Sequence, residues 1–328
     1  MLPRISTRSA FADALQGWPP PVLDPAGPFA GPVTILAWVL LAMSALVLLA
    51  VIAALWIAFH GKGRLKDQIG SKQIIWIGGI AAPVVVLSAL LVYGLTLTNH
   101  LSDPPTRNEM RVRITGEMWW WRVAYLDRQG RTVMLDANEL HIPVGEPVTL
   151  ELESADVIHS FWIPRLSGKL DMIPGRRNVM RIQADKPGVY AGQCAEYCGG
   201  PHALMGFVVI AHQPEAFAAF MAERRSPARS PAPGSEAARG AALFQSAGCA
   251  ACHRIEGTEA NGLAGPDLTY MASRSSIGAG ILPNNRGTLI GWIGDSQSIK
   301  PGNRMPPYSS SLSGPDLQAL ATYLEAQR

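Results

Sequence analysis

Charged residues are absent from two long stretches of this sequence, although they make up 16% of the whole chain. Residues 27–59 and 73–99 contain no Asp, Glu, Lys or Arg. Each stretch is longer than the ~20 residues that a helix needs to cross a bilayer. We therefore predict two transmembrane helices, at about 33–59 and 73–98.

The formal net charge is only +3 and no recognition motif accompanies it, so nucleic-acid binding has no support.

The short segment between the two apolar stretches predicts their orientation. It reads HGKGRLKDQIGSK, residues 60–72, and is rich in Lys and Arg. The positive-inside rule places such a loop in the cytoplasm, so both termini face the outer side of the membrane. A cleaved signal peptide is the rival explanation of the first stretch, but a signal normally starts closer to the N-terminus.

Cysteine and histidine are scarce, with four and seven residues in the chain, and the cysteines fall in two short motifs. The first motif, CAEYCGGPHALM at 194–205, combines two thiols, an imidazole and a thioether. A further histidine lies upstream in DVIHSFW. Such soft ligands argue against magnesium or calcium and suit copper best. The predicted copper ligands are His159, Cys194, Cys198, His202 and Met205.

Two other interpretations of this motif stay open. The two cysteines and two histidines form a set that is common in structural zinc sites, although Met205 would then have no role. A disulfide between Cys194 and Cys198 is possible in an oxidising compartment, although it leaves both histidines and the methionine unexplained.

The second cysteine motif, CAACH at 249–253, is typical of covalent attachment of a c-type haem. Cys249 and Cys252 would form the thioethers, and His253 would bind the iron. Met305 in PGNRMPPY is the best candidate for the sixth ligand, with Met271 as its competitor. An amphipathic lead-in, the GPDL segment, the methionine loop and a closing helix occur in the order of a small class I cytochrome c, so we predict an all-α domain at 236–328.

The region between the apolar stretches and the haem motif has the pattern of an all-β domain. Segments such as RVRITGEMWWWRVAY and PVTLELES alternate and are rich in β-branched residues, and Pro and Gly punctuate them. We predict a Greek-key sandwich at 100–221. RRSPARSPAPGSE, at 224–236, reads as an extended linker, which we predict at 222–235. Residues 1–32 form a separate N-terminal segment.

Two longer stretches, HSFWIPRLSGKLDMIPGR and GVYAGQCAEYCGGPHALMGFVVI, resemble subunit II of cytochrome c oxidase. With the haem motif, the chain is similar to A-type haem-copper oxidase subunits that carry a fused C-terminal cytochrome c domain. This resemblance implies a cupredoxin fold and a binuclear CuA centre, in which Cys194 and Cys198 bridge two copper ions and the Glu196 carbonyl is a weak ligand. It also implies that electrons enter through Trp119 and that the Glu196 carboxylate helps bind magnesium.

The same resemblance implies the function. Electrons would pass from the fused haem c to CuA and on to the oxygen-reducing centre of subunit I, coupled to proton translocation in a bacterial inner membrane. Neither apolar stretch contains a histidine, so haems within the membrane must belong to that partner. Subunit III, an external cytochrome c or other periplasmic donor, and membrane lipid are the further expected partners. Gln73 stands where the family often has a glutamate that feeds a proton channel.

Other functions are weighed against this one. A quinol oxidase subunit would lack the copper ligands, and a nitrous oxide reductase would need a histidine-rich domain that seven histidines cannot supply. The small subunit of a CuA-containing nitric oxide reductase and a freestanding membrane-anchored carrier or copper-delivery protein remain as alternatives. The other four histidines are expected at interfaces or in solvent: His60, His100, His141 and His212.

Overall fold

The computed structural model describes residues 20–101, 104, 106, 109–224 and 230–327. The chain divides into two compact units. One is Gly31–Pro105, and the other combines the described residues of Met1–Ala30 with those of Thr106–Arg328. Residues 1–19 of the predicted N-terminal segment and residues 225–229 of the predicted linker lie outside the described residues.

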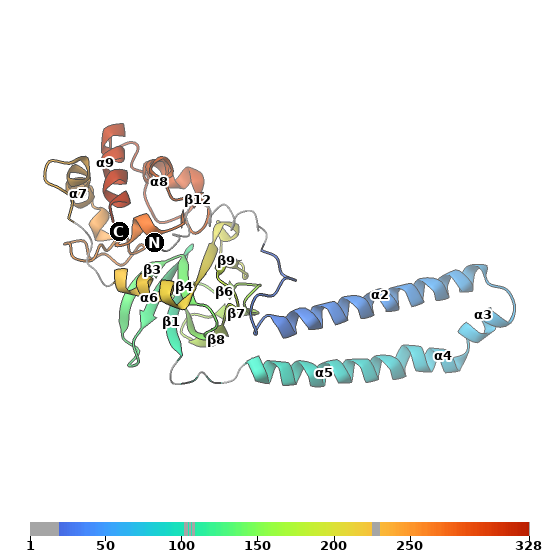
Figure 1. The fold of residues 1–328 in the computed structure, drawn as a ribbon. Coiled ribbons are helices and arrows are strands. Elements are labelled where there is room, and N and C mark those ends of the chain that lie inside the picture. The colour runs from blue at the N-terminus through green and yellow to red at the C-terminus, as the bar shows by residue number, and fades with distance from the viewer. Residues whose placement is uncertain (1–19, 102–103, 105, 107–108, 225–229, 328) are drawn as a thin grey trace. The chain divides into compact units, whose positions relative to one another are not determined.

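The smaller unit contains two helices that are long and apolar enough to span a membrane (Figure 1). The first is α2 (Gly31–His60), and the second runs through Lys72–Leu101. Between them lies a short helix, α3 (Arg64–Ile69), where the sequence had predicted only a loop. The two long helices are apolar on all sides, which suits a lipid environment better than water.

The second long helix changes its winding near its N-terminal end. It consists of α4 (Lys72–Trp76), a π-helical turn η1 (Ile77–Ala81) and α5 (Ala82–Leu101). Pro83 is the second residue after the turn and lacks the N–H that would bond to a carbonyl four residues earlier. A π-turn is one of the ways in which a helix accommodates such an interruption.

Two five-stranded sheets form the β-sandwich, with strand orders β3-β2-β1-β5-β8 and β4-β10-β9-β6-β7. The pairs β1–β5 and β4–β10 are parallel and the other neighbours are antiparallel. This mixed arrangement is the predicted cupredoxin-like sandwich. The first sheet contains β1 (Met110–Glu117), β2 (Trp120–Leu126), β3 (Thr132–Ala137), β5 (Val148–Ser154) and β8 (Asn178–Ile182). The second contains β4 (Glu139–Pro143), β6 (His159–Trp162), β7 (Lys169–Met172), β9 (Gly188–Cys194) and β10 (Gly206–His212).

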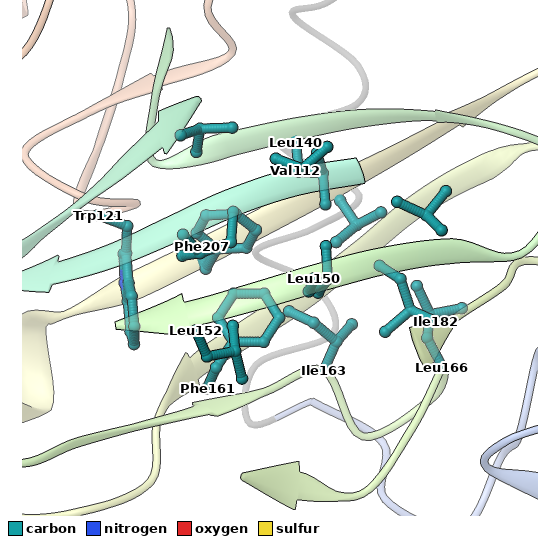
Figure 2. Packing of buried hydrophobic residues seen from close by; sticks show 14 of the residues in the cluster. Val112, Trp121, Leu140, Leu150, Leu152, Phe161, Ile163, Leu166, Ile182 and Phe207 are labelled. Carbon is teal, nitrogen blue, oxygen red and sulfur yellow. The ribbon is translucent and has the colours of Figure 1, made fainter. Parts of the chain in front are cut away.

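The alternating residues of these strands point into one apolar core (Figure 2). Trp121 is completely buried and meets Phe161 and Phe207 edge to face, with ring centroids 5.6 and 5.9 Å apart. Aromatic rings favour this geometry because the positive edge of one faces the negative face of another. Trp121 is therefore the member of the WWW run that packs internally, which leaves Trp119 and Trp120 partly exposed.

The sandwich is extended at both ends of its sequence. The backbone of Ala26 pairs with that of Arg165, at 2.7 Å, and with that of Asp185, at 2.9 Å, so described residues of the N-terminal segment lie against it. After β10, helix α6 (Pro214–Glu223) continues beyond the predicted domain end at residue 221. Its Phe220 stacks on His141, which is buried rather than solvated.

The haem half, which we define as residues 230–327, is built on three helices around a second apolar core. They are α7 (Glu236–Ser246), α8 (Arg286–Ile299) and α9 (Gly314–Glu325). Each begins at a side chain that accepts a bond from its first turn, Ser235, Asn285 or Ser313. Short 3-10 turns η3 (Cys249–Ala251) and η4 (Met271–Ser273) join them. A two-stranded ribbon, β11 (Ser276–Ile277) with β12 (Leu282–Pro283), is an addition to the predicted all-α domain.

Candidate copper and haem sites

The five side chains predicted as copper ligands lie together around the loop between β9 and β10. We call residues 194–206 the copper loop; it includes the 3-10 turn η2 (His202–Leu204). Cys194 ends β9 and pairs across the sheet with β6, the strand that His159 begins. The local folding of two neighbouring strands therefore brings residues from two distant motifs to one place.

Short distances connect this cluster. The Cys194 Sγ lies 3.9 Å from the His159 Nδ1 and 3.8 Å from the Cys198 Sγ. The Cys198 Sγ lies 3.5 Å from the His202 Nδ1 and 3.8 Å from the Met205 Sδ. Since a disulfide needs sulfurs about 2.05 Å apart, the two cysteines are not bonded to each other.

The backbone carbonyl of Glu196 completes the set of predicted donors. It lies 3.2 Å from the Cys194 Sγ. The Glu196 side chain points elsewhere: it is 44% exposed, and its carboxylate is 4.0 Å from the Lys169 Nζ. The carbonyl and the carboxylate of Glu196 therefore point to different places and could bind two different metal ions.

Two residues that the sequence analysis did not single out hold the His159 ring. Its Nε2 lies 2.9 Å from the Asp156 Oδ1, so the ring N–H donates to the carboxylate and Nδ1 faces Cys194. On the other side, a Cβ added to Gly116 in β1 would lie 2.8 Å from the His159 Cδ2. No local sequence pattern marks either residue.

The electrostatics of the two thiols suit a bound cation. A hydrogen bond from Cys198 lowers the pKa of Cys194 to about 3, against the opposing effect of burial. The same contact and burial raise the pKa of Cys198. Ionisation of one thiol therefore disfavours ionisation of the other. A nearby positive charge would favour the state in which both are thiolates. Two thiolates, two imidazoles, a thioether and a carbonyl are together a donor set that fits copper.

Trp119 lies against the copper loop. Its indole Nε1 donates a hydrogen bond to the Cys198 carbonyl at 2.8 Å. The far edge of the same ring faces Gly302 in the haem half, where a Cβ would lie 3.6 Å from it. The side chain that was predicted to admit electrons thus touches both the copper loop and the haem half.

A cavity of about 440 Å³ lies beside Trp119 and Trp120, and the haem motif lines it. This volume is in the range of small-molecule and cofactor sites. The predicted attachment and axial residues all line the cavity: Cys249, Cys252, His253 and Met305. The geometry and the thiol, imidazole and thioether donors fit a haem.

The proximal histidine of the haem motif is held in one orientation. His253 Nδ1 lies 2.8 Å from the Pro266 carbonyl, so its N–H donates there and Nε2 is the nitrogen that remains for iron. A Cβ on Gly265 would lie 2.6 Å from the His253 ring, so the backbone passes directly behind the imidazole.

Met305 and Met271 both line the cavity, but their sulfurs have different surroundings. The Met271 Sδ accepts a contact from Arg274 Nη1 at 3.7 Å, and the residue is 5% exposed. Met305 has its backbone fixed instead: its carbonyl accepts from Ser296 at 3.0 Å and from Gln297 at 2.8 Å. These contacts favour Met305 as the thioether ligand.

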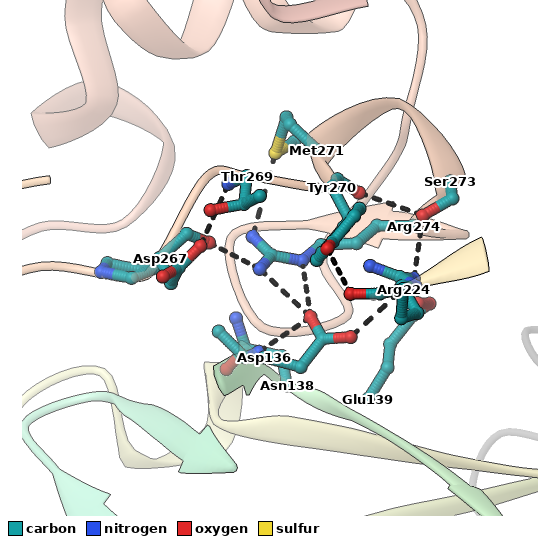
Figure 3. Close-up of polar contacts among 12 residues, drawn as sticks. Asp136, Asn138, Glu139, Arg224, Asp267, Thr269, Tyr270, Met271, Ser273 and Arg274 are labelled. Carbon is teal, nitrogen blue, oxygen red and sulfur yellow. Dashed lines mark hydrogen bonds and ion pairs between the residues drawn. The ribbon is translucent and has the colours of Figure 1, made fainter. Parts of the chain in front are cut away.

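A buried ionic cluster joins the haem half to the β-sandwich (Figure 3). Arg274 forms an ion pair with Asp136 at 2.9 Å, and Arg224 approaches the same carboxylate at 3.6 Å. Beside it, the Ser275 N–H donates to the Glu139 carboxylate at 2.7 Å. These contacts place the two halves of the larger unit against each other.

A mixed β-sandwich with a Cys, His and Met cluster, next to a pocket lined by a haem-attachment motif, defines a copper- and haem-binding electron-transfer protein. The family profile for cytochrome c oxidase subunit II, periplasmic domain, matches residues 126–212, and that for cytochrome c matches residues 237–327. The chain belongs to the cytochrome c oxidase subunit 2 family.

Individual relatives agree with these matches. Cytochrome c oxidase subunit 2 of Alkalihalophilus pseudofirmus is 35% identical over 315 residues, which cover 93% of this chain and 90% of the relative. The Bacillus subtilis protein of the same name is 28% identical, covering 81% and 78%. Among solved structures, the periplasmic domain of cytochrome oxidase subunit II from Bradyrhizobium japonicum shares 30% identity and a TM-score of 0.32, covering 37% of this chain and 96% of that one.

Family membership confirms the general predictions. The chain is subunit II of a cytochrome c oxidase with a cytochrome c domain, and so part of an oxidoreductase complex. Membership of this family implies CuA copper, a haem and a haem-copper oxidase partner. The two apolar helices indicate a membrane-anchored protein. The quinol oxidase, nitrous oxide reductase, nitric oxide reductase and freestanding-carrier alternatives are correspondingly disfavoured.

Proposed function

We propose that this chain accepts electrons on a covalently attached haem c and delivers them to a binuclear CuA centre, from which they reach the oxygen-reducing partner subunit. The observation that carries the proposal is the position of Trp119. Its ring lines the haem cavity, and its indole N–H is bonded to the copper loop. Donor and acceptor sites are therefore separated by a single side chain.

The residues of the copper loop would hold the metal as follows. Cys194, Cys198, His159 and His202 would hold the two copper ions, and Met205 and the Glu196 carbonyl would be the weaker donors. When bound, the copper pair supplies a one-electron redox centre that shares its charge change over two ions. Asp156 fixes the His159 tautomer.

In the haem cavity, Cys249 and Cys252 would form the covalent thioethers, and His253 and Met305 would bind the iron. A haem held by an imidazole and a thioether has a raised reduction potential, as a carrier requires. Pro266 holds the His253 N–H, and the contacts of Ser296 and Gln297 with the Met305 carbonyl fix the methionine backbone. Trp119 and Trp120 line the same cavity.

The finer features of the assembly are part of the same proposal. We place the protein in a bacterial inner membrane with both termini on the periplasmic side, because the basic segment 60–72 favours a cytoplasmic loop. The proposed domains cover residues 100–221 and 236–328, with a linker between them. The proposed partners are subunit III and an external cytochrome c, which acts as the electron donor. The exposed Glu196 carboxylate is the proposed magnesium ligand. Gln73 cannot exchange a proton at neutral pH, so either subunit I supplies the entry acid of that channel or proton uptake by the channel differs in this protein.

Metal analysis combined with electron paramagnetic resonance on the purified full chain tests this function. The expected result is two copper ions per haem iron, with the unpaired electron of oxidised copper shared over two nuclei. Alkaline pyridine treatment should give the spectrum of a haem held by two thioethers. Zinc in place of copper, or a single isolated copper, would contradict the proposal.

A further inference from the structure

Lys300 is a buried lysine between the haem half and the β-sandwich. It follows helix α8 and precedes the loop that carries Met305. Its Nζ donates to three backbone carbonyls: those of Trp119 at 2.6 Å, Leu204 at 2.8 Å and Gly278 at 2.9 Å. An ammonium group has three donor hydrogens, so these contacts use all of them.

The three carbonyls come from segments that matter for electron transfer. Trp119 bonds through its indole to the copper loop, and Leu204 is the residue before Met205 in that loop. Gly278 belongs to the haem half, in the turn between β11 and β12. The Lys300 side chain therefore connects the haem half to two segments of the sandwich, one at Trp119 and one at Leu204. Both segments lie beside the predicted copper ligands.

A second contact repeats this connection on the other side of Met205. The Gly206 N–H donates to the Ala279 carbonyl at 2.9 Å. Ala279 is 1% exposed and has a φ of 66°, which is uncommon for a residue other than glycine. This buried backbone conformation accompanies the contact with Gly206. The backbone on each side of Met205 is thus bonded to the haem half, through Lys300 on one side and directly on the other.

We propose that Lys300 is a positioning residue for internal electron transfer, which keeps the haem half in one fixed place against the copper loop. This inference rests on the proposed function, because it assumes that both cofactors are bound. The step is a one-electron transfer: the haem iron is oxidised by one electron, the copper pair is reduced by one, and no bond forms or breaks. Its rate depends on a fixed geometry rather than on diffusion of a tethered domain.

The experiment uses the oxidase complex containing the full chain. A photoexcited reductant reduces the haem rapidly, and the copper absorbance then reports internal electron transfer. In the unaltered complex, we expect a rate that does not change when glycerol raises the viscosity. In Lys300→Met, we expect a roughly ten- to hundredfold slower transfer that becomes slower still with viscosity, because docking now requires a motion.

Two further variants serve as controls. Lys186→Met removes an exposed lysine of the sandwich and should leave the rate unchanged. Lys300→Arg keeps a cationic donor and should restore part of the rate. The haem spectrum and the copper resonance are recorded for each variant, because an altered ligand set would change them and a lost docking contact would not.

The possible outcomes separate the two proposals. An unaltered rate in Lys300→Met with full copper and haem content overturns the positioning role, and so does a viscosity-dependent rate in the unaltered complex. If Lys300→Met does not retain haem, the viscosity measurement on the unaltered complex still decides. Failure to find two coppers and one haem in the unaltered complex contradicts the proposed function instead.

Discussion

The Arg274 guanidinium lies 2.9 Å from the Asp136 carboxylate, and the two side chains are 4% and 1% exposed. They come from opposite halves of the larger unit (Figure 3). An ion pair that is withdrawn from water contributes mainly through the penalty of breaking it, since the remaining charge is left buried. This pair therefore makes the association of the two halves specific.

Replacement of Arg274 should strongly lower the stability of the folded full chain. Arg274→Met leaves the Asp136 carboxylate buried with only Arg224 at 3.6 Å, so we expect a loss of about 3 kcal/mol in the free energy of unfolding. Denaturant titration followed by circular dichroism measures it. The matched control is Arg286→Met, which removes an exposed pair with Glu325 and should lose less than about 1 kcal/mol. Equal losses in the two variants would contradict the argument.

Copper affinity should depend on a residue that does not bind copper. Asp156→Asn weakens the acceptor for the His159 Nε2–H, and such partners of ligands change metal affinity by roughly ten- to hundredfold. Competition with a copper chelator gives the affinity. Asp185→Asn, an exposed acid of the same sandwich, is expected to retain it. The explanation fails if both variants hold copper equally well.

The choice between two methionines as haem ligand can be tested directly. Met305→Leu should lose the charge-transfer absorption of a thioether-bound ferric haem and lower its reduction potential. Met271→Leu should keep both, because the Met271 sulfur already contacts Arg274. Optical spectra during a redox titration measure the two properties together. The reverse pattern would assign Met271 as the ligand.

Stability should fall in mild acid because of buried His141 and its half-buried neighbour His212. His141 Nδ1 lies 2.7 Å from His212 Nε2, and burial lowers the pKa of both, that of His141 well below its usual value. The native state keeps them neutral, whereas the unfolded chain binds protons below about pH 6.5. Folding stability is therefore present above this pH and is lost as the pH falls through it.

Replacement of one histidine isolates this effect. Between pH 7 and pH 5, His141 alone should account for about 2 kcal/mol of lost stability. His141→Phe keeps the stacking on Phe220, so its stability should decline less over the same interval. Denaturant titrations of both proteins at the two pH values give the difference. Parallel declines would show that these histidines do not titrate on unfolding.

The sequence predicted which side chains gather better than it predicted their surroundings. The copper and haem motifs are short, so residue type and spacing alone indicate which side chains gather. The cluster around His159 depends on one long-range feature, the pairing of β6 with β9, which the sequence alone does not show. Asp156 and Gly116 act through their contacts with the His159 ring, and no local pattern separates them from ordinary turn and strand residues.

The contacts between the two halves could not be predicted. Arg274 and Asp136 are 138 positions apart, and neither lies in a motif. Lys300 reads as a solvated lysine before a proline, yet it is buried by the β-sandwich. The strands β11 and β12 have two residues each, too few for any alternation to be recognised. Helix α3 covers six residues, fewer than two turns, and its charged composition suits a loop equally well.

The burial of the Lys300 and Arg274 contacts has a consequence for how ionic strength acts on the enzyme. Dissolved ions screen exposed charges over a Debye length of about 8 Å in physiological salt, but they screen buried pairs much less. Transfer from the resident haem to copper is then insensitive to salt. Any salt dependence of turnover reports on the arrival of the mobile donor, so one titration separates delivery from internal transfer without altering a single residue.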